Sequence, residues 1–197
     1  DLLATTPVSI LDAASTEVSE TTPMPQSAVF LQFNDYIGLN SPQVRTYGYV
    51  GDEAVIINNT DGFSAATTLD QSVERVYFSG SRGDYQFART GNQLSVYGAS
   101  TAGAFDTLVL KTPLQNDSNG TELVFAKDVT SATSKAAVSA LLTGGNMTVG
   151  GSIVPDLGTG SKLSLPSATQ LTWSGAAVPT KPIPTGPSKA MVFLADN

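Results

Sequence analysis

The sequence predicts an all-β fold, either a β-sandwich or a β-roll-like single domain. From Val29 onward, short apolar segments recur about every 8 to 14 residues, with Gly, Asn, Asp or Pro between them, which is typical of all-β domains. Apolar and polar residues also alternate within several segments, as they do along a half-buried strand. We expect strands at 29–33, 44–50, 53–58, 73–78, 84–89, 93–98, 106–111, 121–126, 146–151, 162–166 and 169–173.

The best-defined element is a β-hairpin over residues 85–98, with Gly91 and Asn92 as its two-residue loop. The pairs that this loop predicts are Thr90 with Gln93, Arg89 with Leu94, Phe87 with Val96 and Tyr85 with Gly98. Tyr85, Phe87, Leu94 and Val96 then share one face, which is expected to be the core face. The preceding segment, 73–78, carries apolar residues on both faces and is therefore expected to be a central strand.

One segment, residues 133–145, has a composition that also fits a helix, with Gly144 as its stop signal. Ala136, Val138 and Ala140 alternate as they would in a strand. Both interpretations stay open at this stage.

Composition argues against catalysis and against nucleic acid as a partner. The chain of 197 residues has no histidine and no cysteine, so it has no Ser-His-Asp triad, thiol nucleophile or thiolate metal site. Its net charge of -7 opposes binding to a phosphate backbone. We therefore expect a protein that is not an enzyme and has no cofactor other than, at most, calcium.

The surface chemistry is typical of an exported protein. Charged residues make up only 14% of the chain, against about 25% in ordinary soluble domains, and Ser and Thr are abundant. No apolar run approaches the roughly 20 residues that a membrane-spanning helix needs. We expect a secreted bacterial protein at the cell surface or in an extracellular matrix, with no membrane span.

Composition also divides the chain into four parts. Residues 1–28 are expected to form an extended N-terminal arm, and residues 29–175 the all-β domain. Residues 176–188 are rich in proline and predict a stiff, extended spacer. Residues 189–197 then form a C-terminal strand.

That terminal strand is the candidate for self-association. Its apolar core is formed by Met191, Val192, Phe193 and Leu194. An apolar strand at the end of a spacer must pair with something, either its own sheet or a neighbouring molecule. Pairing between molecules would make the protein a homo-oligomer or homopolymer.

The tripeptide Arg82-Gly83-Asp84 matches the integrin-binding motif but lies between the strand at 73–78 and the hairpin. Two glycines in residues 79–84 are what a connecting turn requires. We favour the turn over the adhesion motif.

The run from residue 73 to 98, followed by residues 106–128 and 144–151, resembles the all-β domains that accompany haemolysin-type (RTX) repeats in secreted bacterial proteins. The matching positions are Asp84, Tyr85, Phe87, Leu94, Val96, Asn119, Gly120, Thr121, Leu123, Phe125 and Ala126. The resemblance implies an exported surface or matrix protein. The glycine-rich calcium nonapeptides of RTX rolls are absent from this sequence.

A different calcium site is conceivable in residues 116–122, where Asp117, Asn119 and Glu122 offer oxygen ligands around a glycine turn. An ordinary Asx/Gly turn is the favoured interpretation. The other carboxylates are expected to be scattered over turns and strand ends, without a catalytic pair: Asp35, Asp52, Glu53, Asp70, Glu74 and Asp106.

Two functions from different classes follow. The leading one is a non-catalytic structural protein that self-associates by strand exchange into a surface layer, filament or matrix. The alternative is a carbohydrate-binding or adhesin module of a larger secreted protein, with a cell-surface glycan as its partner. In that case Trp173, Tyr47 and Tyr49 would stack on sugar rings, although packing in the core is the favoured role of these aromatic residues.

Overall fold

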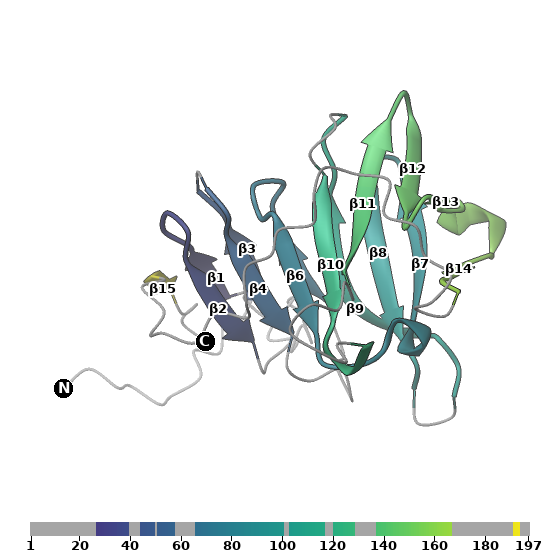
Figure 1. Ribbon diagram of the computed structural model, residues 1–197, viewed down its shortest axis with the longest axis horizontal. Coiled ribbons are helices and arrows are strands. Elements are labelled where there is room, and N and C mark those ends of the chain that lie inside the picture. The colour runs from purple at the N-terminus through teal and green to yellow at the C-terminus, as the bar shows by residue number, and fades with distance from the viewer. Residues whose placement is uncertain are drawn as a thin grey trace, which may run out of the picture.

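The computed structural model describes residues 27–39, 44–49, 51–57, 66–100, 103–116, 120–128, 137–166 and 191–193. These residues form an eight-stranded and a seven-stranded β-sheet, three short 3-10 turns and no α-helix (Figure 1). The predicted all-β class is therefore confirmed. No helix in this part of the chain has the length and apolar character needed to cross a membrane.

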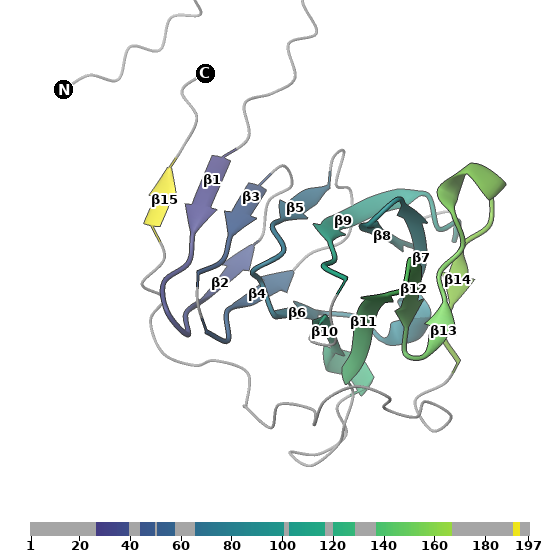
Figure 2. The same cartoon turned by 90° about the horizontal axis from the view of Figure 1, so that it is seen from above.

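One part of the domain is a two-sheet parallel roll of eight strands. Along the chain these eight strands lie alternately in the two sheets, and each pairs parallel with the preceding one of the eight in its sheet (Figure 2). Those of the eight-stranded sheet are β1 (Ser27–Phe30), β3 (Val44–Tyr47), β5 (Thr67–Leu69) and β9 (Thr107–Pro113). Those of the seven-stranded sheet are β2 (Tyr36–Leu39), β4 (Ala54–Ile57), β6 (Arg75–Phe78) and β10 (Thr121–Phe125). We call these eight strands the coiled region.

The coiled region is held in register by ladders of apolar residues. Two rows of cross-strand partners run across the seven-stranded sheet, two residues apart along each strand. One row consists of Ile37, Val55, Val76 and Leu123, and the other of Leu39, Ile57, Phe78 and Phe125. All except the half-buried Ile37 are buried between the sheets. Because side chains alternate along a strand, slipping by one residue would turn both ladders outward.

The other part of the domain consists of antiparallel strands, and we call it the antiparallel end. Its strands are β7 (Tyr85–Thr90), β8 (Gln93–Gly98), β11 (Ala137–Thr143), β12 (Asn146–Val149), β13 (Ser152–Ile153) and β14 (Leu163–Ser164). The hairpin of β7 and β8 has the predicted register at every pair, and Gly91 adopts the left-handed φ of 60° that its loop requires.

Other expectations can be compared with the observed strands. Segment 73–78 contains β6, which is central as predicted, between β4 and β10. The described part of the segment that fitted either a helix or a strand, residues 137–145, forms β11 and the turn after it. The expected strands do not include β2, β5 and the two-residue β13. Without β2 and β5 the parallel coils cannot be recognised from the sequence. The last two residues of the predicted arm at 1–28, Ser27 and Ala28, lie in β1. The rest of that arm, the spacer at 176–188 and the expected strand at 169–173 lie outside the described residues.

The coiled region ends at β1 and β2. Here β15 (Met191–Phe193) pairs antiparallel with β1, with Val192 opposite Val29. β2 is the last strand of the seven-stranded sheet, as Figures 1 and 2 show. We call β1, β2 and β15 the open end.

Candidate functional site

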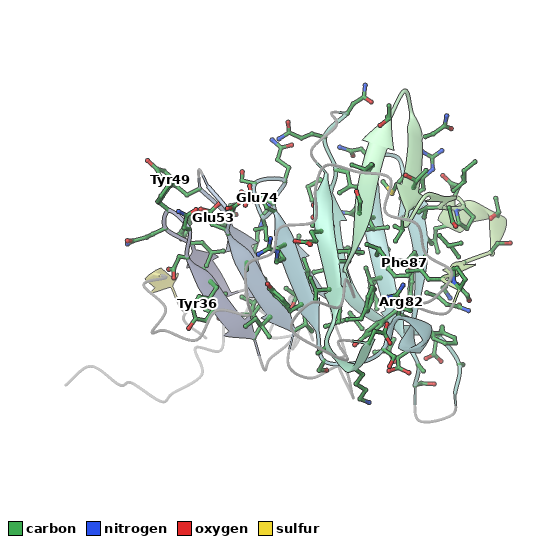
Figure 3. The ribbon with its side chains drawn as sticks, in the orientation of Figure 1. Tyr36, Tyr49, Glu53, Glu74, Arg82 and Phe87 are labelled. Atoms are coloured by element: carbon green, nitrogen blue, oxygen red, sulfur yellow. The ribbon has the colours of Figure 1, made fainter. Side chains whose placement is uncertain are left out.

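The turns that lead from the eight-stranded to the seven-stranded sheet stack on one another along one edge of the coiled region. Their register is fixed because Tyr36, Ala54 and Arg75 are successive partners in the parallel ladder. The residues directly before them are all acidic: Asp35, Glu53 and Glu74. Figure 3 shows Tyr49, Glu53 and Glu74 along this edge, away from Arg82 and Phe87 of the antiparallel end.

Glu53 is fully buried and joins neighbouring turns through its carboxylate and its backbone. Its Oε1 accepts a hydrogen bond from the backbone N–H of Asn34, 3.0 Å away. Its own N–H donates to Oε2 of Glu74 over 2.9 Å. The Oδ1 of Asn34 accepts a further bond from the N–H of Asp52, at 3.0 Å. The side chains therefore tie three successive coils together at their turns.

Glu74 titrates far from its ordinary range. Burial raises the pKa of its carboxyl from 4.5 to about 7, and repulsion by the Glu53 carboxylate adds to the rise, although the hydrogen bond from the Glu53 backbone opposes it. Within the described part of the chain, neither Glu53 nor Glu74 has a lysine or arginine within ion-pair distance. The Glu74 carboxyl therefore changes charge near neutral pH, and no described lysine or arginine forms an ion pair with it.

A groove of about 350 Å³ lies at the same edge. It is lined by Tyr49, Gly51, Gln71, Ser72, Glu74, Pro113, Leu114, Gln115, Gly120 and Thr121. Tyr49 is 64% exposed, so its ring is available to a ligand. The groove thus combines an exposed aromatic ring, two side-chain amides, two hydroxyls and a titratable carboxyl.

Of the three predicted sugar-stacking residues, the structure describes Tyr47 and Tyr49, and these two have different surroundings. Tyr47 stacks on Phe30, with ring centroids 4.7 Å apart and planes 8° from parallel, and the guanidinium of Arg45 lies 5.3 Å from the Tyr47 ring centroid. Tyr47 is therefore a packing residue, and Tyr49 is the aromatic residue that lines the groove. Trp173 lies outside the described residues.

The predicted calcium ligands are placed only in part, since Asp117 and Asn119 lie outside the described residues. Glu122 is in β10, 7% exposed, where it forms an ion pair with Arg75. Burial raises the pKa of Glu122, and the hydrogen bond from Arg75 opposes that rise. The Glu122 carboxylate is thus engaged with an arginine of the neighbouring strand. The described ranges contain no group of three acidic side chains arranged to hold a metal ion.

Arg82-Gly83-Asp84 forms a 3-10 turn between β6 and β7, as the turn interpretation predicted. The Arg82 side chain is 3% exposed and its Nε lies 2.8 Å from Oδ2 of Asp128. Asp84 accepts a 2.7 Å hydrogen bond from the N–H of Ser81. The guanidinium that an integrin would need is buried in this turn.

The terminal strand is also accounted for in part. Met191, Val192 and Phe193 form β15 on the chain's own β1, while Leu194 lies outside the described residues. Docking onto its own sheet was one of the two predicted outcomes.

The expectation that the carboxylates are scattered is wrong for Glu53 and Glu74. They are 21 residues apart in sequence, yet the parallel stacking of coils makes them neighbours. A signal was present, because an acidic residue directly precedes each of the segments YIGL, AVII and RVYF. Its meaning becomes clear only when these segments are recognised as equivalent strands of successive coils.

Comparison with known proteins gives no relative: no family model, no curated protein and no solved structure matches this chain.

Proposed function

We propose that the protein is a non-catalytic structural component outside the bacterial cell, which self-associates by exchanging its C-terminal strand. In the exchanged form, residues 191–193 of one molecule pair with β1 of the next. The single observation that carries the proposal is the antiparallel pairing of β15 with β1 at the open end. The same main-chain hydrogen bonds form whether the two strands belong to one molecule or to two.

The difference between the two ends of the molecule supports the proposal. At the antiparallel end, the last strands of both sheets, β13 and β14, have only two residues each. Very short edge strands are a common protection against unwanted pairing. At the open end, β2 has four residues and, among the described residues, pairs on one side only, with β4. A chain of molecules would therefore grow from the open end.

Composition supports an extracellular location. The low fraction of charged residues, the abundant Ser and Thr, and the resemblance to RTX-associated domains all favour an exported protein. A net charge of -7 keeps single molecules soluble before they assemble.

A cysteine cross-link tests the exchange directly, since the natural chain has no cysteine. Ala28 and Phe193 are directly opposite in the β1–β15 pair. Directly opposite residues have Cβ atoms about 4.5–5.5 Å apart, close enough for a disulfide after a small adjustment. We expect the double variant Ala28→Cys, Phe193→Cys to give covalent dimers and longer oligomers on a non-reducing gel after oxidation. If only monomers with an internal disulfide form, the exchange proposal fails.

A matched control uses Thr148 and Ile153, which are opposite one another in the β12–β13 hairpin. Thr148→Cys with Ile153→Cys should link only within one chain. In addition, deletion of residues 189–197 should abolish assembly. Light scattering and electron microscopy measure this loss. Unchanged polymers from the deleted chain would show that another surface drives assembly.

A second candidate function is a carbohydrate-binding module. It is favoured by one observation, the exposed Tyr49 at the rim of a groove with polar side chains. Aromatic rings with neighbouring amide and carboxyl groups are the side chains that bind sugars. We expect the natural protein to bind an oligosaccharide and the Tyr49→Ala variant to lose that binding.

A further inference from the structure

The groove at the stacked turns has features that identify the kind of ligand it would hold. Its volume of about 350 Å³ is within the range of small-molecule sites, which is roughly 300–1,000 Å³. Residues from three turns line it: Tyr49 and Gly51 before β4, Gln71 and Glu74 before β6, and Gln115 after β9. A ligand would therefore contact three coils at once.

The polar lining fits a ligand with several hydroxyl groups. Gln71 and Gln115 each offer an amide that can both donate and accept hydrogen bonds, and Ser72 adds a hydroxyl. The ring of Tyr49 offers an apolar face beside these groups. An apolar ring face flanked by hydroxyls is the chemical character of a pyranose sugar.

The charge of the groove narrows the choice further. Glu74 lines it, and the fully buried Glu53 lies directly behind, linked to Glu74 through its backbone N–H. No described lysine or arginine lies within ion-pair distance of either carboxyl. A buried carboxylate without a counter-charge is unfavourable, so a cation supplied by the ligand would be strongly favoured. The nearby ring of Tyr49 also attracts a cation to its face.

We propose that this groove binds a saccharide that carries a protonated amino group, with the sugar ring against Tyr49 and the ammonium group at Glu74. The inference rests on the second candidate function and assigns its site and ligand class. It is independent of strand exchange, because none of the groove residues belongs to β1, β2 or β15.

The test compares three oligosaccharides of equal length by isothermal titration calorimetry at pH 7: a tetramer of glucosamine, its fully N-acetylated form, and neutral cellotetraose. We expect the glucosamine tetramer to bind at least about tenfold more tightly than the other two, as expected for one charge-assisted contact. Because the ammonium group favours the ionised carboxyl, binding should also release a proton from Glu74. Measurements in buffers with different heats of ionisation detect that proton.

Variants identify the site. Tyr49→Ala and Glu74→Gln should each weaken binding of the glucosamine tetramer by about tenfold or more. Two matched controls should bind as the natural protein does: Phe33→Ala, which removes another aromatic ring with 64% exposure, and Asp106→Asn, which removes an exposed carboxylate at the start of β9. Since Tyr49 is exposed, its truncation is not expected to disturb folding, which circular dichroism will verify.

Each other outcome overturns the inference. Equal or tighter binding of the acetylated or neutral tetramer would refute the selection for an amino group, while the second candidate function would survive. Binding of the glucosamine tetramer that Tyr49→Ala leaves unchanged would place the site elsewhere. Absence of binding by all three oligosaccharides would count against both the inference and the second candidate function.

Discussion

The coiled region and the antiparallel end differ in how far apart in the sequence their paired residues lie. In the antiparallel end, paired strands follow one another directly, as in the hairpins of β7 with β8 and β11 with β12. In the coiled region, paired residues are far apart in sequence: Arg45 is beside Thr68, and Thr68 is beside Lys111. Local pairs need little loop closure, whereas parallel pairs require long segments to be ordered first. The coiled region therefore depends more on contacts that join separate turns.

An aromatic cluster connects the two regions. Phe78 of β6 and Phe125 of β10 stack with centroids 5.5 Å apart, and Tyr85 of β7 lies 4.8 Å and 5.6 Å from them. All three side chains are almost completely buried. This cluster makes the coiled region and the antiparallel end parts of one core.

The largest effect is expected when the connection is cut. Phe78→Ala should lower the free energy of unfolding by about 3–5 kcal/mol, because it removes a buried ring and leaves a cavity between the two regions. Urea denaturation followed by circular dichroism measures the loss. Phe78→Leu, which keeps more of the buried volume, should cost distinctly less.

If the two regions share one core, the Phe78→Ala variant will still unfold in a single transition. Two separate transitions would instead show that the coiled region and the antiparallel end fold as independent units.

A smaller effect distinguishes one turn of each region. Gly91 in the β7–β8 hairpin and Gly120 before β10 both have a φ of 60°. At either position, an alanine in this left-handed backbone conformation would cost about 1–2 kcal/mol of conformational energy. At Gly91 the added Cβ meets nothing within 4 Å, but at Gly120 it would collide with the carbonyl oxygen of Ala140. We expect Gly120→Ala to destabilise the protein by at least about 1 kcal/mol more than Gly91→Ala does, because the clash adds to the backbone cost.

The comparison of these two variants uses the urea midpoint under identical conditions. Equal losses would mean that the chain before β10 can shift away from Ala140 of β11 and so relieve the clash.

A third effect concerns pH and the Glu74 carboxyl of the coiled region. The pKa of Glu74 is about 7 in the folded protein and near 4.5 when the chain is unfolded. The folded state therefore holds this proton more tightly, so the contribution of Glu74 to stability is complete below about pH 4.5 and is lost as the pH rises through 7. As the pH rises from 5 to 8, the urea midpoint of the natural protein should decrease relative to that of the Glu74→Gln variant.

Asp106→Asn is the control for this measurement, since Asp106 is exposed at the start of β9. Its pH profile should run parallel to that of the natural protein. A Glu74→Gln variant with the same profile would mean that the Glu74 carboxyl ionises at an ordinary pH.

The antiparallel end could be predicted from the sequence in detail because its information is local. The Gly91-Asn92 loop determines the register of all six pairs in its hairpin, and alternation identifies the buried face. The coiled region could not be predicted in the same way. The missed strands β2 and β5 contain a glycine and two threonines respectively, so neither has strong apolar alternation. These strands are stabilised by packing against the neighbouring coils, which their own sequences do not predict.

The candidate site shares this limitation. Residue type alone made Tyr49 one of three possible sugar-stacking residues, with core packing as the favoured role. The pairing of Glu53 with Glu74, in contrast, depends on the register between β4 and β6. A prediction of that register requires the coil repeat, and the repeat is interrupted by the β7–β8 hairpin between β6 and β9. Sequence alternation alone does not reveal equivalent positions across such an insertion.

The spacing of the first coils has a consequence for how such a chain can change in length. Ala28 pairs with Arg45 and Tyr36 with Ala54, which are seventeen and eighteen residues further along. Duplicating one such stretch in the gene would add one full layer. Its strands would pair with the layers on both sides, and both ends of the domain would stay as they are. Related molecules, if they arose this way, should differ in height by whole layers rather than by single residues.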